Sequence, residues 1–534
     1  MREILNGSLL WSVLRQLRDW YRQGAIAHFF RAIADSYPFS KTKHLWHRFI
    51  WAPMFGGENS KPPVYVRIAG HFARWLTRVG DCVRQSVFYR ACVKIAKPVS
   101  RFVGGGVIGR ACRFFGVRGL LIMAIALYLP IDFFLRNVVQ IGFLSSLWDE
   151  MLMAVGMLYV CWRRGMYHKE RMTRATPVDA YILFFVGIAF FLMCVVSPYM
   201  GIAIDGFRAV VQYIFWFFVM IRLIEDDRDF AILYGTLVVL ATLIGLHGIY
   251  QYIIAAPIPA GWVSQTEESV RTRVYSLTGS PNIMGSFLVL FAPMAAGLAY
   301  YSKKLWLRIM GIGAAGIMCL SILFTFSKGA WGGLVIAVLI FALYLDRRLI
   351  GLMAVGGGVA LIAIPSIANR ITYLFTADYA AASARAGRSI RWATGLQLLL
   401  SNNKWLGFGL GRFGGAVAMQ NKIIEETDTF SYFYMDNYYL KTLVEMGYIG
   451  LIAFIILLVG MSLWCVRALG RTRRTDIHPL AVAMFAGMVG VLAHCYFENI
   501  FEVPYMMAYF WTLAAGILYL GYFRKRIGPK QENG

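Results

Sequence analysis

Two polar segments that interrupt an otherwise apolar part of the chain contain seven arginines, and five of these are candidates for binding an anion. An arginine guanidinium binds a phosphate group through two parallel, charge-assisted hydrogen bonds and stays protonated at any physiological pH. Beside low-dielectric lipid, such contacts are screened less than in bulk water. This pattern predicts a site for a lipid-borne phosphate or diphosphate. The five residues are Arg271 and Arg273 in segment 255–281, and Arg385, Arg388 and Arg391 in segment 367–437.

The second segment contains a run that is typical of a helix, AASARAGRSIRWATGLQLLLSNN (381–403). Arg385 and Arg388 are three positions apart, and Arg388 and Trp392 are four apart, so these side chains share one face of the helix. A basic face beside an aromatic side chain suits a phosphosugar. The alternative is a solvated helix that lies on lipid headgroups.

Asp436 and Asn437 end the same polar segment, just before an apolar stretch. A carboxylate near the arginines could act as a general base and accept the proton of a sugar hydroxyl. Asp and Asn are also favoured at the N-cap of a helix, where they accept backbone hydrogen bonds. Spacing alone favours the helix cap as the role of Asp436.

Five glycines follow the arginine-containing run in the sequence WLGFGLGRFGG. A nucleotide-binding glycine loop requires a preceding strand and a GK[ST] ending, and neither is found here. The glycines are better explained by tight turns and close backbone approach. They are Gly407, Gly409, Gly411, Gly414 and Gly415.

The chain that positions these residues is strongly apolar. Of its 534 residues, 59% are hydrophobic and 15% are charged, against about 25% charged in soluble proteins. A helix needs about 20 apolar residues to cross a bilayer. The sequence therefore predicts an all-α polytopic membrane protein with about twelve transmembrane helices and a large extracytoplasmic loop between the ninth and tenth. These helices are expected near 119–135, 142–162, 178–198, 203–222, 230–254, 282–301, 309–326, 330–345, 349–366, 443–466, 480–497 and 505–523.

Basic residues decide the predicted orientation. The net charge of +25 would suggest nucleic acid as the partner of a soluble protein, but cytosolic loops of membrane proteins collect Lys and Arg. With both termini inside, 40 of the 53 basic residues are cytosolic. We therefore expect a multi-pass protein of the cytoplasmic membrane with cytosolic termini, outer loops 255–281 and 367–437, and no nucleic-acid partner.

Residues 1–118 precede the predicted spans and carry a net charge of +15. Stretches such as SLLWSVLRQLRDWYRQ are typical of basic amphipathic helices on the anionic inner leaflet, with a small cytosolic helical appendage as the alternative. The polytopic domain is expected over 119–523 and a cytosolic tail over 524–534. No cleaved signal peptide is predicted. The eight cysteines form no CxxC pair, so the sequence predicts neither a disulfide framework nor a zinc site.

Three more charged residues lie near predicted outer helix ends. Lys328 in FSKGAW would contact an anionic ligand or extend toward the membrane interface. Glu445 and Glu498 are candidates for binding an acceptor sugar or for orienting the arginines.

Four motifs occur in an order that resembles the O-antigen ligase and O-antigen polymerase superfamily. They are Arg273 with VYSLTGSPNIMGSFL, then FTFSKGAW, then GRSIRW leading into WLGFGLGRFG, and then DNYYLKTLVEMGYIGL. The resemblance covers about residues 119–523. It implies a GT-C-like, metal-independent, inverting glycosyltransferase of the bacterial cytoplasmic membrane. Such an enzyme needs no cofactor and uses undecaprenyl-diphosphate-linked glycans as donors.

The resemblance also implies roles for individual residues. The family arginines that hold the donor diphosphate correspond to Arg273 and Arg388, and Arg385, Arg391 and Lys328 would assist. Asp436 stands where the ligases carry a histidine, so a carboxylate replaces an imidazole as the expected base. Residues expected to bind the acceptor or support the site are Asn437, Glu445, Glu498 and Trp392.

The missing histidine points away from the lipopolysaccharide ligases and toward a polymerase of the teichuronic-acid or exopolysaccharide kind. Such a polymerase would work with a flippase and a chain-length regulator. One alternative is a ligase that transfers the lipid-linked glycan to a different lipid or protein. Another is a transporter or flippase of lipid-linked sugars. A transporter would carry ionisable groups along a path through the membrane, whereas the unusual charges here gather at the outer helix ends.

Overall fold

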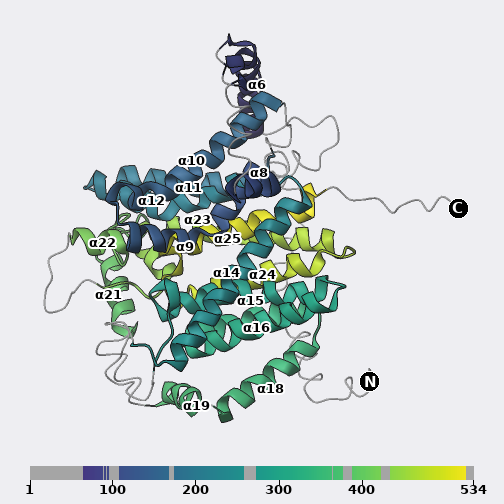
Figure 1. Ribbon diagram of the computed structural model, residues 1–534. Helices are drawn as coiled ribbons and strands as arrows, with labels where there is room; N and C mark the ends of the chain where they lie inside the picture. Colours follow the sequence, from purple (N-terminus) through teal and green to yellow (C-terminus); the bar gives the residue numbers. More distant parts are fainter. Residues whose placement is uncertain are drawn as a thin grey trace, which may run out of the picture. The chain divides into compact units, whose positions relative to one another are not determined.

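The computed structural model describes residues 64–94 except 88 and 92, then 107–167, 174–257, 272–363, 365–376, 388–422 and 433–524. These residues form helices joined by short connections, and they contain no strand (Figure 1). The chain divides into two units, residues 1–75 with 175–180, and residues 76–174 with 181–534. In the first unit, Asp179 accepts a hydrogen bond from the backbone of Thr176 at 3.0 Å. All contacts described below belong to the second unit.

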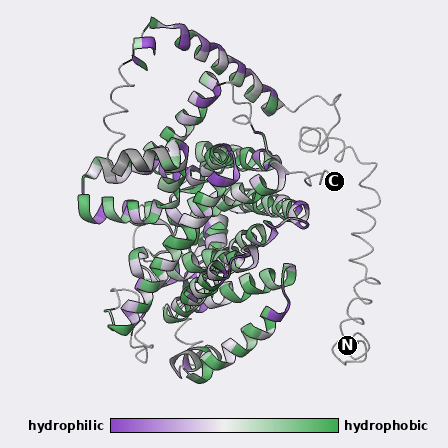
Figure 2. Ribbon diagram, turned by 45° about the vertical axis from the view of Figure 1, so that its right-hand side comes forward, coloured by the Kyte–Doolittle hydropathy of each residue, from purple (hydrophilic) through white to green (hydrophobic). Residues whose placement is uncertain are grey.

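Seven helical stretches are long and apolar enough to cross a membrane, and hydrophobic residues cover most of their length (Figure 2). An eighth candidate is a pair of helices bent by 70°, Phe114–Ala126 and Tyr128–Val139. The protein is therefore an all-α polytopic membrane protein. The seven stretches are α11 (Pro177–Val196), α12 to α13 (Met200–Leu223), α14 (Asp227–Ile253), α15 (Pro281–Tyr301), α16 (Leu305–Phe324), α23 (Tyr438–Thr472) and α25 with η9 (Pro504–Phe523).

The remaining predicted spans are helical as well. Three are shorter apolar helices, α17 (Lys328–Tyr344), α18 (Arg348–Ala363) and α24 (His478–His494). The helix α10 (Gly142–Tyr167) covers the predicted span 142–162 but is not among the apolar candidates. Every predicted span thus coincides with a helix, while twelve membrane crossings stay a prediction.

Residues 1–118 are described only in part. A helix, α6 (Val64–Gln85), begins this part, and α8 (Val107–Ala126) follows it. The amphipathic run SLLWSVLRQLRDWYRQ lies outside the described residues.

Helix α15 is the centre of the core that supports the site, and it packs against α16, α17 and α24 (Figure 1). Small residues allow this close packing, as they do between membrane helices generally. A Cβ atom added to Gly487 would lie 2.1 Å from the backbone oxygen of Leu290. One added to Gly490 would lie 2.7 Å from the oxygen of Gly333. These contacts hold α24 close against α15 and α17.

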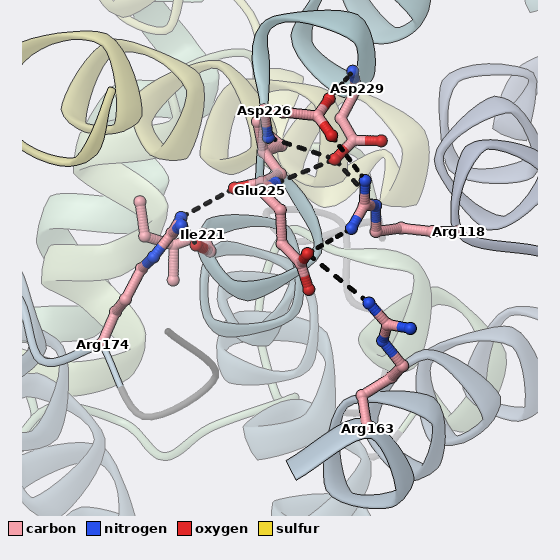
Figure 3. Close-up of polar contacts among 8 residues, drawn as sticks. Arg118, Arg163, Arg174, Ile221, Glu225, Asp226 and Asp229 are labelled. Carbon is pink, nitrogen blue, oxygen red and sulfur yellow. Dashed lines mark hydrogen bonds and ion pairs between the residues drawn. The ribbon is translucent and has the colours of Figure 1, made fainter. Parts of the chain in front are cut away.

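The turn between α13 (Trp216–Leu223) and α14 is tied to neighbouring helices by arginines (Figure 3). Arg118 forms ion pairs with Asp226 and Asp229 at 2.8 Å and with Glu225, which also lies 3.6 Å from Arg163. The Arg118 side chain is only 18% exposed, and its partners Glu225 and Asp229 are 11% and 3% exposed, so these two ion pairs are largely shielded from water. Asp226 is 52% exposed.

We expect Arg118→Gln to destabilise the protein by on the order of 3 kcal/mol, because three clustered carboxylates lose their shared cation. Arg136→Gln is the matched control. Arg136 is 49% exposed and pairs with Asp132 one helical turn away, so its loss should cost below about 0.5 kcal/mol. Thermal unfolding in detergent measures both, and equal midpoints for the two variants would contradict the expectation.

Candidate functional site

Arg273 is almost completely buried between the beginning of α15 and the end of α16. Its Nε donates a hydrogen bond to the backbone oxygen of Thr325 at 3.1 Å, and its Nη2 donates to Oδ1 of Asn282 at 3.0 Å. Ser280 caps α15 and Pro281 occupies its first turn, so Asn282 is held at the helix start. The Arg273 guanidinium is therefore oriented from two sides.

Asn282 connects Arg273 to the segment that follows α24. Its Nδ2 donates to Oε2 of Glu498 at 2.5 Å. Burial raises the pKa of the Glu498 carboxyl above its ordinary value, and the negative charge of Asp436 raises it further, while Asn282 and Arg388 lower it. Glu498 therefore lies in the field of Arg388 and Asp436 as well as in contact with Asn282.

Arg388 and Trp392 hold the two oxygens of the Asp436 carboxylate. Nε of Arg388 lies 2.9 Å from Oδ2, and Nε1 of Trp392 lies 3.0 Å from Oδ1. Arg388 begins α21 (Arg388–Leu400), and one helical turn separates it from Trp392, as the sequence predicts. The Arg388 side chain is 35% exposed and Asp436 only 12%, so the arginine faces solvent and the carboxylate lies beneath it.

The structure corrects the helix-cap interpretation of Asp436. The N-cap of α23 is Asn437, whose Oδ1 accepts the backbone hydrogen bond of Leu440 at 3.0 Å. Asp436 is left to pair with Arg388 and Trp392. Asn437 therefore caps the helix, while the neighbouring Asp436 belongs to the polar cluster with Arg388 and Trp392.

The glycine-rich segment after α21 packs directly on the backbone of α23. The backbone N–H groups of Phe408 and Gly409 donate to the oxygens of Val444 and Glu445 at 2.8 and 2.9 Å. Gly447 interrupts α23 with a φ of 64°, and Gly407 opposite it has a φ of 85°. The close-approach interpretation of the glycines is confirmed, because a Cβ on Gly407 would lie 2.4 Å from the Gly447 nitrogen.

Gly407→Ala should therefore destabilise the protein by about 3 kcal/mol, because the added methyl group overlaps backbone and the residue has a positive φ. The control is Gly313→Ala in the exposed part of α16, where nothing lies within 4 Å of the added atom. Folded yield and unfolding temperature in detergent should fall only in the first variant. A stable Gly407→Ala protein would show that the loop can shift away from α23.

A buried ion triad holds the same region together. Nζ of Lys441 lies 2.9 Å from Glu445 and 3.0 Å from Glu502, and Glu445 also accepts the Phe413 N–H at 3.2 Å. Glu445 is fully engaged by these partners. Glu445 thus fixes the glycine-rich segment against α23, and its expected role in binding an acceptor or orienting the arginines stays a prediction.

The other predicted cations are distributed around the cluster. Arg391 lies over the ring of Phe433, with 5.9 Å from its Cζ to the ring centroid. Lys328 begins α17, and its Nζ lies 5.5 Å from the ring centroid of Tyr373. Arg271 and Arg385 lie outside the described residues.

Sequence reasoning missed Asn282 as a site residue. Asn282 is the first residue of the predicted span 282–301. Only the tertiary structure shows that its amide bonds to both Arg273 and Glu498. Among the described residues, no group of three or more His, Cys, Asp or Glu side chains could hold a metal ion.

The comparison with protein families agrees with the sequence motifs. Residues 313–455 match the model of the family described as O-antigen ligase. The matched region includes Arg388, Trp392 and Asp436, whereas Arg273 and Glu498 lie outside it. No curated protein shows a matching sequence. The match over residues 313–455 therefore supports the resemblance of this membrane protein to the O-antigen ligase and O-antigen polymerase superfamily.

Proposed function

We propose that the protein is an extracytoplasmic glycosyltransferase that polymerises polyprenyl-diphosphate-linked oligosaccharides into a cell-surface polysaccharide. The observation that carries this proposal is that two arginines are held beside neighbouring residues of one segment. Arg388 pairs with Asp436 and lies over the ring of Phe497, and Arg273 bonds to Asn282, which bonds to the adjacent Glu498. The family match supports the same class of enzyme. We place the site at the outer face of the membrane, with both termini in the cytosol, because this orientation keeps most Lys and Arg inside.

The cluster has two guanidinium groups for the two phosphates of a donor. In the proposed reaction, the donor diphosphate binds Arg273 and replaces Asp436 as the partner of Arg388. Positive groups fixed in this way stabilise the charge that develops on the leaving diphosphate. Arg385, Arg391 and Lys328 would add to this positive field from the edge of the site.

Release from Arg388 leaves the Asp436 carboxylate available as a base. The acceptor hydroxyl loses its proton to Asp436 and its oxygen forms a bond to the anomeric carbon. The bond from that carbon to the diphosphate oxygen breaks, and polyprenyl diphosphate leaves. A single displacement of this kind inverts the anomeric configuration and requires no metal ion.

A ligase would use the same donor site with a different lipid or protein as acceptor. A transporter of lipid-linked sugars is the second class considered, and it would need ionisable groups along a path through the membrane. The residues of the proposed donor site lie instead near the beginnings of α15, α21 and α23 and just after α24. This arrangement favours an enzyme.

The test is to incubate purified protein in detergent with a short undecaprenyl-diphosphate oligosaccharide, without nucleotide sugar or added metal. Gels and mass spectrometry should show products that are multiples of the repeat unit. Transfer only after a separate lipid or protein acceptor is added would indicate a ligase. No transfer under either condition, together with uptake of the donor into proteoliposomes, would replace the enzyme by a transporter.

A further inference from the structure

A cavity of about 840 Å³ lies at the C-terminal end of α23. Asp436 of the arginine cluster precedes the other end of the same helix. It is lined by the turn 470–477 between α23 and α24, and by Leu520, Gly521 and Arg524 at the end of η9. The wall is tightly built, because a Cβ added to Gly521 would lie 2.5 Å from the Cβ of Ala468. The cavity is therefore enclosed by the end of α23, the start of α24 and the end of η9.

The lining of this cavity is strongly basic. It contains four arginines and a single acid, Asp476. Arg524 is neutralised by two contacts of 2.8 Å to Asp227 and lies 3.8 Å from Asp476. Within the described part of the chain, Arg473 and Arg474 make no ion pair and are exposed. The cavity thus has a net positive charge that is suited to an anion.

The position of the cavity relative to the apolar helices points to lipid as the source of that anion. The turn joins α23 to α24, so it lies at the boundary where both leave the membrane. Arg471 lies over the ring of Tyr522, with 4.2 Å to the centroid, and Arg467 over Trp464, with 4.6 Å. A Tyr beside a cation, as in the Tyr522 and Arg471 pair, is typical of the interface at headgroup level, whereas the Trp464 ring is fully buried.

An apolar stripe on α23 leads to the same end of the helix. Ile452, Val459 and Leu463 are 52%, 51% and 52% exposed. Their spacing of seven and four residues places them along one side of the helix. An acyl chain could lie along this stripe while its headgroup reaches the arginines.

We propose that this cavity binds the phosphate group of an anionic phospholipid through Arg473 and Arg474, with Arg471 beside them. Basic pockets between membrane helices are known to hold anionic headgroups. This inference is independent of the proposed glycosyltransferase function, because none of its residues belongs to the arginine cluster.

The experiment uses the full-length protein reconstituted in vesicles of equal parts phosphatidylglycerol and phosphatidylcholine, then released for native mass spectrometry. The unaltered protein should retain phosphatidylglycerol in preference to phosphatidylcholine. In R473Q/R474Q, this retention should fall by roughly tenfold or more, because two phosphate contacts lose their charge. The exposed pair Lys303 and Lys304, in the turn before α16, supplies the matched control K303Q/K304Q.

The two double variants separate a lipid site from a general effect of charge and from a site for a soluble anion. Equal loss of phosphatidylglycerol in both would overturn the proposal, because it would reflect net charge alone. Displacement of the lipid by millimolar inorganic phosphate would assign the cavity to a soluble anion and overturn the lipid assignment. Unchanged unfolding temperatures in both variants would show that lost retention comes from the site and not from misfolding.

Discussion

Arg388→Ala is expected to lower the rate of transfer from a polyprenyl-diphosphate donor by about 100-fold to 1000-fold, the effect of removing one preorganised group from a developing charge. Nε of the guanidinium lies 2.9 Å from Oδ2 of Asp436. In the proposed reaction it exchanges this carboxylate for a phosphate. Its loss removes a phosphate contact and also leaves the partly buried Asp436 without its cation.

Two further variants make this result specific. Arg388→Lys keeps the positive charge but cannot form the bidentate hydrogen bonds of a guanidinium to a phosphate. Its activity should therefore lie between those of Arg388→Ala and the unaltered protein. Lys404→Ala removes an exposed cation from the same polar segment, outside the cluster, and should leave the rate within about twofold of the unaltered protein. Product formation is followed over time by gel at saturating donor. Full activity in Arg388→Ala would rule out the proposed diphosphate site.

Asp436→Asn should reduce kcat by about 100-fold or more, the usual contribution of a general base. The amide has nearly the same shape and can still accept the hydrogen bond from Trp392, so folding should be retained. Product formation at saturating donor measures kcat, and thermal unfolding in detergent checks that the fold is retained. An unchanged kcat in Asp436→Asn would exclude this carboxylate as the base.

Glu498→Gln is the variant that distinguishes a base from a positioning residue. Glu498 holds Asn282, which in turn holds Arg273, so its replacement should weaken donor binding, seen as a raised KM, more than it lowers kcat. The raised pKa of the buried Glu498 carboxyl means that it loses its proton only at higher pH than an ordinary carboxylic acid. If Glu498→Gln lowers kcat by about 100-fold or more and Asp436→Asn does not, the base is Glu498.

The sequence by itself determined the helical framework and the chemistry of the candidate site. Burying a polar backbone in lipid requires helices, so each long apolar run predicted one, and all the predicted spans are helical. Local spacing also placed Arg388 and Trp392 on one face, because residues four apart on a helix are neighbours. The motif order identified the superfamily before any contact was known.

Only the tertiary structure decided which charges meet. Arg388 and Asp436 are 48 positions apart, and Asn282 and Glu498 are 216 apart, so no local pattern encodes either contact. Spacing alone favoured Asp436 as a cap and left Glu445 as a ligand-binding candidate. Packing made Asn437 the cap instead and paired Glu445 with Lys441, since a buried charge must find a partner and that partner depends on which helix ends come together.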